Sequence, residues 1–91
     1  METQQILYQN ENRAIKLTLN ISPNNAYTTI YDSGKNVIRS EQQCNVDGND
    51  IWEMIGQLVT ANTGTYYIVW KIIEGDNVYF HKTKIMVEAI L

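Results

Sequence analysis

Within residues 13–21, apolar and polar side chains alternate strictly from Ile15 to Ile21. One side of the run carries Ile15, Leu17, Leu19 and Ile21, and the other carries Lys16, Thr18 and Asn20. A period of two over this length predicts a β-strand with one buried face and one solvated face. Arg13 and Lys16 are expected on the solvated side.

Turn residues divide the rest of the chain into further short runs. Pro23, Asp47-Gly48 and the glycine-containing segments at 32–35 and 74–77 mark turns, and Gly34 is expected to supply a positive φ. The runs between them are rich in Tyr, Trp, Ile, Val and Thr, which favour strands. Residues 36–41 are mixed and polar, as in an edge strand. Seven strands and no helix are predicted, at 3–8, 13–21, 26–31, 36–41, 50–55, 65–73 and 78–90, within a single domain of residues 1–91.

The run at 65–73 is apolar on both faces. Its first face carries Tyr66, Ile68, Trp70 and Ile72, and its second carries Tyr67, Val69, Lys71 and Ile73. In the last run, the predicted inward positions are Tyr79, Thr83, Ile85 and Val87. Trp52 lies in the predicted strand at 50–55 and is a further structural candidate.

Composition excludes several classes of protein. The formal net charge is −3 and no basic stripe is evident, so nucleic-acid binding is not expected. No apolar run approaches the roughly 20 residues of a membrane helix, so no membrane association is expected. The N-terminal residues lack the pattern of a signal peptide, and a lone cysteine permits no internal disulfide. Synthesis in a reducing cytoplasm is therefore expected.

The residues that usually carry chemistry are scarce. The chain has one histidine, His81, and one thiol, Cys44, too few for a zinc shell, and nothing in their spacing indicates a catalytic pair. An exposed strand histidine and an unreactive cysteine that behaves as a small hydrophobe are expected. We therefore predict no catalytic residue, no metal site, no cofactor and no small-molecule substrate. His81, Lys82 and Lys84, together with Lys71, form a small basic patch. Most such patches are merely solvated, and the alternative is that this one steers an acidic partner.

Residues 62–68, Asn-Thr-Gly-Thr-Tyr-Tyr-Ile, resemble the immunoglobulin-superfamily signature at the start of strand F. The resemblance implies that Tyr66 is a tyrosine-corner residue whose hydroxyl bonds nearby backbone. It also places Ile68 where the second disulfide cysteine of that family stands, with Leu17 or Leu19 facing it across the core. No tryptophan lies on the third strand, so the chain departs from antibody-type domains. The expected fold is an antiparallel, disulfide-free immunoglobulin-like β-sandwich.

The whole layout resembles small immunoglobulin-like modules of bacteriophage baseplates, tails and head accessories. This implies a non-catalytic virion protein, made in the host cytoplasm, that binds itself or other virion proteins through β-sheet surfaces. The candidate interface consists of Tyr67, Val69 and Ile73, with Ile6 and Tyr8 on an N-terminal strand suited to pairing with another sheet edge. Coverage of this surface by the chain's own edge strands is the alternative. The alternative function is a small inhibitor or regulator that binds a host protein.

Overall fold

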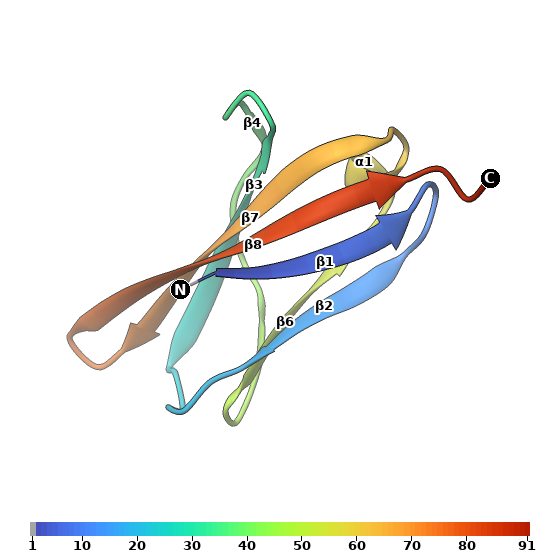
Figure 1. Ribbon diagram of the computed structural model, residues 1–91. Coiled ribbons are helices and arrows are strands. Elements are labelled where there is room, and N and C mark those ends of the chain that lie inside the picture. Colours follow the sequence, from blue (N-terminus) through green and yellow to red (C-terminus); the bar gives the residue numbers. More distant parts are fainter. Residues whose placement is uncertain (1) are drawn as a thin grey trace.

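The computed structural model describes residues 2–91 and arranges them in two β-sheets (Figure 1). The larger sheet has the strand order β1 (Glu2–Tyr8), β8 (Asn77–Glu88), β7 (Gly64–Glu74), β3 (Asn25–Asp32) and β4 (Val37–Gln43). The smaller sheet has the order β2 (Arg13–Thr18), β6 (Asp50–Ile55) and β5 (Asn45–Asp47). The described residues contain one helix, α1 (Gln57–Thr60), and none long and apolar enough to cross a membrane.

The strands form where the sequence alternates. β2 buries Ile15 and Leu17 and exposes the residues between them. β8 buries every second residue from His81 to Val87. Because side chains on a strand point alternately to opposite faces, this pattern fixes which face of each strand turns inward.

The first and last strands of the chain are neighbours. β1 runs parallel to β8, pairing Glu2 with Lys82 and Tyr8 with Glu88, and Figure 1 shows the two strands side by side. The other strand pairs are antiparallel. β1 and β4 are therefore the two edges of the larger sheet.

The inward side chains of both sheets share one core. Trp70 is its largest fully buried side chain, and burial of a Leu, Ile or Val side chain contributes about 1.5 to 3 kcal/mol. The cluster takes residues from both sheets and from α1, namely Leu7, Ile15, Leu17, Ala26, Ile30, Cys44, Ile51, Ile55, Val59, Ile68, Trp70, Ile72, Ile85 and Val87. The two sheets are thus held together by apolar contact.

Two predictions about the elements are wrong. There are eight strands in the described chain, because β5 adds three residues that pair with β6. α1 occupies part of the connection expected to lack helix, with Val59 buried in the core. Both elements are too short to produce a recognisable periodicity. The strand predicted at 13–21 ends at Thr18, although Leu19 and Ile21 still pack against the core.

One prediction about a single residue is also wrong, and another holds only in part. The positive φ in the 32–35 turn belongs to Lys35, at 66°, and not to Gly34. Tyr79 lies on the inward side, opposite the buried Ile72, but it is 44% exposed. It lines an open hollow together with Leu19 and Ile21 and is not packed into the core.

Candidate functional site

The larger sheet has a second face, turned away from the core, that is rich in tyrosine and lysine. We call the outward side chains of β3, β7 and β8 the outer face. In register across the sheet, Tyr31 lies opposite Tyr67, and Tyr67 lies opposite Lys84. Further members of the face are Tyr27, Thr29, Val69, Lys71, Phe80 and Lys82. Tyrosines on adjacent strands therefore stand beside lysines.

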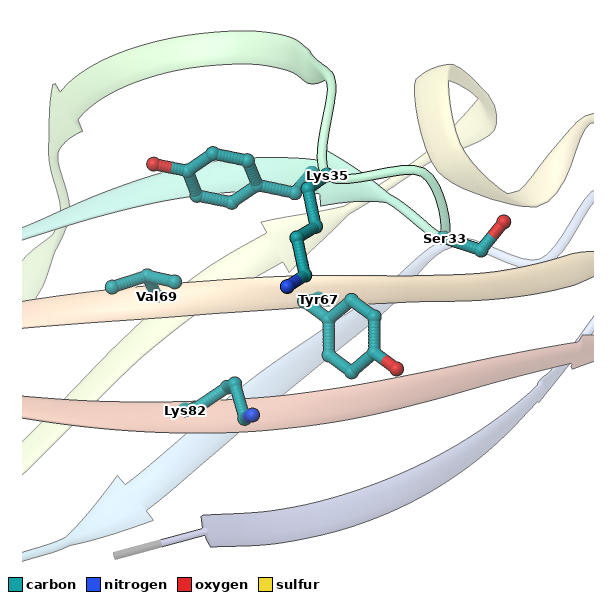
Figure 2. Close-up of a pocket in the computed structure, with 6 residues that line it drawn as sticks. Ser33, Lys35, Tyr67, Val69 and Lys82 are labelled. Carbon is teal, nitrogen blue, oxygen red and sulfur yellow. The ribbon is translucent and has the colours of Figure 1, made fainter.

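A hollow of about 310 Å³ opens on this outer face. Tyr31, Ser33, Lys35, Tyr67, Val69 and Lys82 line it. Figure 2 shows the side chain of Lys35 reaching from the turn after β3 towards Tyr67, with Lys82 approaching from β8. Two ammonium groups and aromatic surface thus border one open depression.

The turn that carries Lys35 is organised by Asp32. The Asp32 carboxylate accepts hydrogen bonds from the backbone amides of Gly34 and Asn36, each at 2.9 Å, and from the Asn36 side chain. These bonds, that from the Asn36 amide first, lower the pKa of Asp32. Asp32 is therefore an anionic anchor that fixes the backbone from which Lys35 projects.

The lysines of the outer face differ in their partners. Lys82 lies 5.4 Å from the centre of the Tyr67 ring and 3.4 Å from the carboxylate of Glu2. Lys71 lies 5.9 Å from the ring of Tyr27 and 3.9 Å from Glu41. Within residues 2–91, no carboxylate comes within 4.0 Å of Lys35 or Lys84. Four of the five lysines of the chain thus border this face, two of them without an ion pair.

The predicted interface residues lie on one side of the larger sheet. Tyr67 and Val69 are half-buried in the hollow, and Ile73 lies farther along β7. On the edge strand β1, Ile6 and Tyr8 are 46% and 47% exposed, and Ile6 pairs with Met86 of β8. The sheet therefore brings the five residues to one side, with β8 between the β1 pair and the β7 residues.

The edge of β1 is less open than expected for strand pairing. The Ile6 carbonyl accepts a hydrogen bond from the Arg13 side chain, and the Tyr8 amide donates to Glu11 at 2.8 Å. An added strand needs such backbone groups as its own partners. The C-terminal half of this edge is thus occupied by the chain itself, which favours the face over the edge as a contact surface.

The predicted structural residues line the inside of the sheets. Ile68, Trp70 and Leu17 are buried, and Leu19 packs against the same cluster. The Tyr66 hydroxyl donates to the carbonyl of Asn62 at 3.3 Å, which is the geometry of a tyrosine corner. Trp52 differs from these residues, because it is only half-buried on β6.

A polar cluster between the sheets was not predicted. The Arg39 guanidinium on β4 donates to Glu53 on β6 at 2.8 Å and also contacts Thr28 on β3. The Arg39 and Glu53 side chains are only 15% and 13% exposed. Charged residues in mixed polar runs usually face solvent, so the sequence gives no signal that these two meet.

His81 is buried, not exposed as predicted, and therefore does not belong to the basic patch. Its Nε2 lies 3.2 Å from the Thr3 hydroxyl, which also bonds Thr83 at 2.8 Å. Trp70 donates to Thr83 at 2.9 Å, which completes a chain of polar groups across the sheet. β8 turns its odd-numbered residues inward, so this histidine joins the core while Lys82 and Lys84 face outward. Burial lowers the pKa of His81 and keeps the imidazole neutral.

The remaining titratable groups do not form a reactive centre. Burial, followed by the charge of Glu53, raises the pKa of Cys44 to about 11, so its reactive thiolate form is suppressed. Among the described residues, no three His, Cys, Asp or Glu side chains gather as metal ligands would. A second hollow of about 450 Å³ is mainly apolar, lined by Leu19, Asn20, Ile21, Ile72, Tyr79, Phe80 and His81. The features that these surfaces present are therefore open hollows with aromatic and aliphatic walls.

Comparisons with known proteins identify the fold. The sequence matches no protein-family model and no curated protein. Titin domain M7 is similar in structure, with a TM-score of 0.60 and 12% identity over 98% of this chain and 88% of that chain. A chimeric titin Z1Z2 has a TM-score of 0.54 and 12% identity over 97% of this chain and 87% of that chain. The fold is all-β and immunoglobulin-like.

A third similar structure is a family 123 glycoside hydrolase from Clostridium perfringens. Its TM-score is 0.60 with 12% identity, over 99% of this chain. The chain spans about a quarter of that hydrolase, 23% of its length. Likeness at this identity describes the fold alone, so neither hydrolysis nor any other activity follows from it.

Proposed function

We propose that this protein is a non-catalytic, immunoglobulin-like β-sandwich module that binds protein partners through the outer face of its larger sheet. The observation that carries the proposal is the concentration of Tyr31, Tyr67 and Val69 with lysines around one open hollow. Aromatic side chains are typical of the centres of protein interfaces. A catalytic function has no comparable support, since the side chains of His81 and Cys44 are both buried.

The binding mechanism would be geometric. Tyr31 and Tyr67 stand in register on adjacent paired strands, so their rings are already ordered before a partner arrives. Tyrosine has few rotatable bonds and offers a large amphipathic surface, which keeps the entropic cost of binding low. A rigid sheet that presents such rings can hold a partner at a defined position without turnover.

We further propose that the module is a structural or accessory component of a bacteriophage particle, in contact with itself or other virion proteins. The general layout of the chain, which resembles such modules, supports this assignment. Genes for portal, capsid or tail proteins are expected beside the gene for this chain. A neighbourhood without them would favour the alternative, a regulator that uses the same face to bind a host protein.

Photocrosslinking tests the binding surface directly. A photoreactive phenylalanine analogue replaces Thr29, which lies opposite Val69 on the outer face, or Lys16, an exposed residue of the smaller sheet. Purified protein is irradiated over a range of concentrations, alone and with proteins from disassembled particles. We expect adducts from position 29 and none from position 16. Adducts from position 16 alone, or equal yields from both, would contradict the proposal.

A further inference from the structure

We propose that the hollow beside Tyr67 is a carboxylate-binding site for an acidic segment of the partner protein, an inference that rests on the proposed function. Lys35 and Lys82 supply the positive charge, and Tyr31, Tyr67 and Val69 supply apolar walls. A hollow of about 310 Å³ is at the small end of the range for ligand sites. It suits one or two carboxylate side chains with their aliphatic stems.

The lysines of the outer face favour a partner segment that carries negative charge. Lys35 and Lys84 have no carboxylate within 4.0 Å among residues 2–91, and both border the outer face. The chain as a whole has ten acidic and seven basic residues, so concentrating lysines here leaves the rest of the surface more acidic than average. An acidic segment would be attracted to this face and repelled elsewhere, which fixes both location and orientation.

Glu2 acts as an internal competitor for this site. Its carboxylate lies 3.4 Å from Lys82, and the two side chains are 54% and 49% exposed. Exposed pairs of this kind contribute little and exchange readily. A carboxylate of the partner would replace Glu2 at Lys82 while also reaching Lys35, which has no such partner.

The backbone of Lys35 supports a binding role for its side chain. Its φ of 66° lies in the left-handed region, which glycine adopts most easily. The Asp32 turn holds it there, through the bonds to Gly34 and Asn36. A lysine at a position suited to glycine sacrifices backbone stability, and its ammonium group beside Tyr67 provides a reason.

The same surface is poorly suited to nucleic acid. Lysine and tyrosine are residues that bind phosphates and stack on bases, but single strands need a basic groove that follows the backbone. Here two of the four lysines are already paired, with Glu2 and Glu41, so two remain. The hollow itself is lined by two lysines, Lys35 and Lys82, and two charges match one or two carboxylates better than a run of phosphates.

Fluorescence polarisation with a labelled probe tests the site. The probe is a short peptide of alternating Glu and Leu, and its control carries Gln in place of every Glu. We expect the acidic peptide alone to bind, with affinity falling as salt rises. Lys35→Gln and Lys82→Gln should each weaken binding about threefold to fivefold, Glu2→Gln should strengthen it, and Lys16→Gln should change nothing.

Lys82→Gln and Glu2→Gln should change peptide binding in opposite directions. Because each of them breaks the same ion pair, a purely structural effect would change binding in the same direction for both. Lys35→Gly adds an independent readout, because it should raise the melting temperature of the protein and still weaken its binding of the acidic peptide. Equal binding of both peptides, or equal loss with Lys16→Gln, would overturn the inference. So would a short oligothymidylate that binds more tightly than the acidic peptide. If both peptides bind equally while crosslinks from position 29 still form, the proposed function stands and only the carboxylate site falls.

Discussion

Substitution of Arg39 by methionine should destabilise the protein far more than loss of a surface charge. The Arg39 guanidinium joins β4 of the larger sheet to Glu53 on β6 of the smaller one, at 2.8 Å. Its removal leaves the Glu53 carboxylate mostly shielded from water, with the Thr28 hydroxyl at 3.1 Å as its remaining partner. An uncompensated charge between two sheets opposes their packing.

The exposure of the two side chains sets the size of the effect. Breaking a fully buried ion pair costs about 3 to 5 kcal/mol, and an exposed pair contributes about 0 to 1 kcal/mol. At 15% and 13% exposure, Arg39→Met should therefore cost about 2 to 3 kcal/mol. Such a loss is a large part of the roughly 5 to 10 kcal/mol typical of a domain of this size.

Urea unfolding near neutral pH measures these costs through a double-mutant cycle. The variants are Arg39→Met, Glu53→Gln and their combination, with Lys16→Met as the control, because Lys16 pairs with Asp50 at 3.8 Å while 58% exposed. The double variant should cost less than the sum of the singles by about 1 kcal/mol or more. Additive losses, or an Arg39→Met cost no larger than the control, would refute a stabilising role for the pair.

Four other predictions concern single residues. The pKa of Cys44 is about 11 in the folded protein, against an ordinary value of 9.0, so the folded protein should hold about a hundredfold less thiolate than the unfolded chain. Alkylation of Cys44 by iodoacetamide should therefore accelerate sharply on unfolding. Equal rates in the folded and unfolded protein would contradict this. Burial lowers the pKa of His81 below 6.5 in the folded protein, so the unfolded chain binds a proton first as the pH falls. The free energy of unfolding should therefore be largest above pH 6.5 and decrease as the pH drops towards the folded-state pKa of His81. In urea unfolding at several pH values, His81→Gln should flatten this slope. Tyr66→Phe should cost about 0.5 to 1.5 kcal/mol by loss of the bond to Asn62. Gly64→Ala should cost about 1 to 3 kcal/mol, because the backbone of Gly64 has a φ of 139° and not because an added Cβ would be crowded. Thermal melts in which Gly64→Ala is milder than Tyr66→Phe would contradict this.

Local patterns predicted much of the fold. Alternation in 13–21 and 65–73 located two strands, because a strand with one buried face must repeat every second residue. The two elements that the sequence did not predict, β5 and α1, have three and four residues, which is too few for a periodic pattern to be visible. The same limit explains the eighth strand that the sequence did not reveal.

The candidate site was predicted only in part. Tyr67 and Val69 stood out because the apolar strand at 65–73 has two apolar faces. Tyr31 and Lys35 did not, since only the register of β3 on β7 and the Asp32 turn bring them to the same hollow. The sequence predicts a strand at 26–31, but it does not show which strand lies beside it in the sheet.

By itself, the sequence determined the all-β character and the scarcity of reactive side chains, because both depend on composition and short-range periodicity. The resemblance of residues 62–68 to the immunoglobulin-superfamily signature also pointed to Tyr66. Only the tertiary structure decided that His81 faces the core, that Arg39 meets Glu53, and that lysines from separate segments border one hollow. These facts depend on strand order and register, which are set by contacts between residues far apart in the chain.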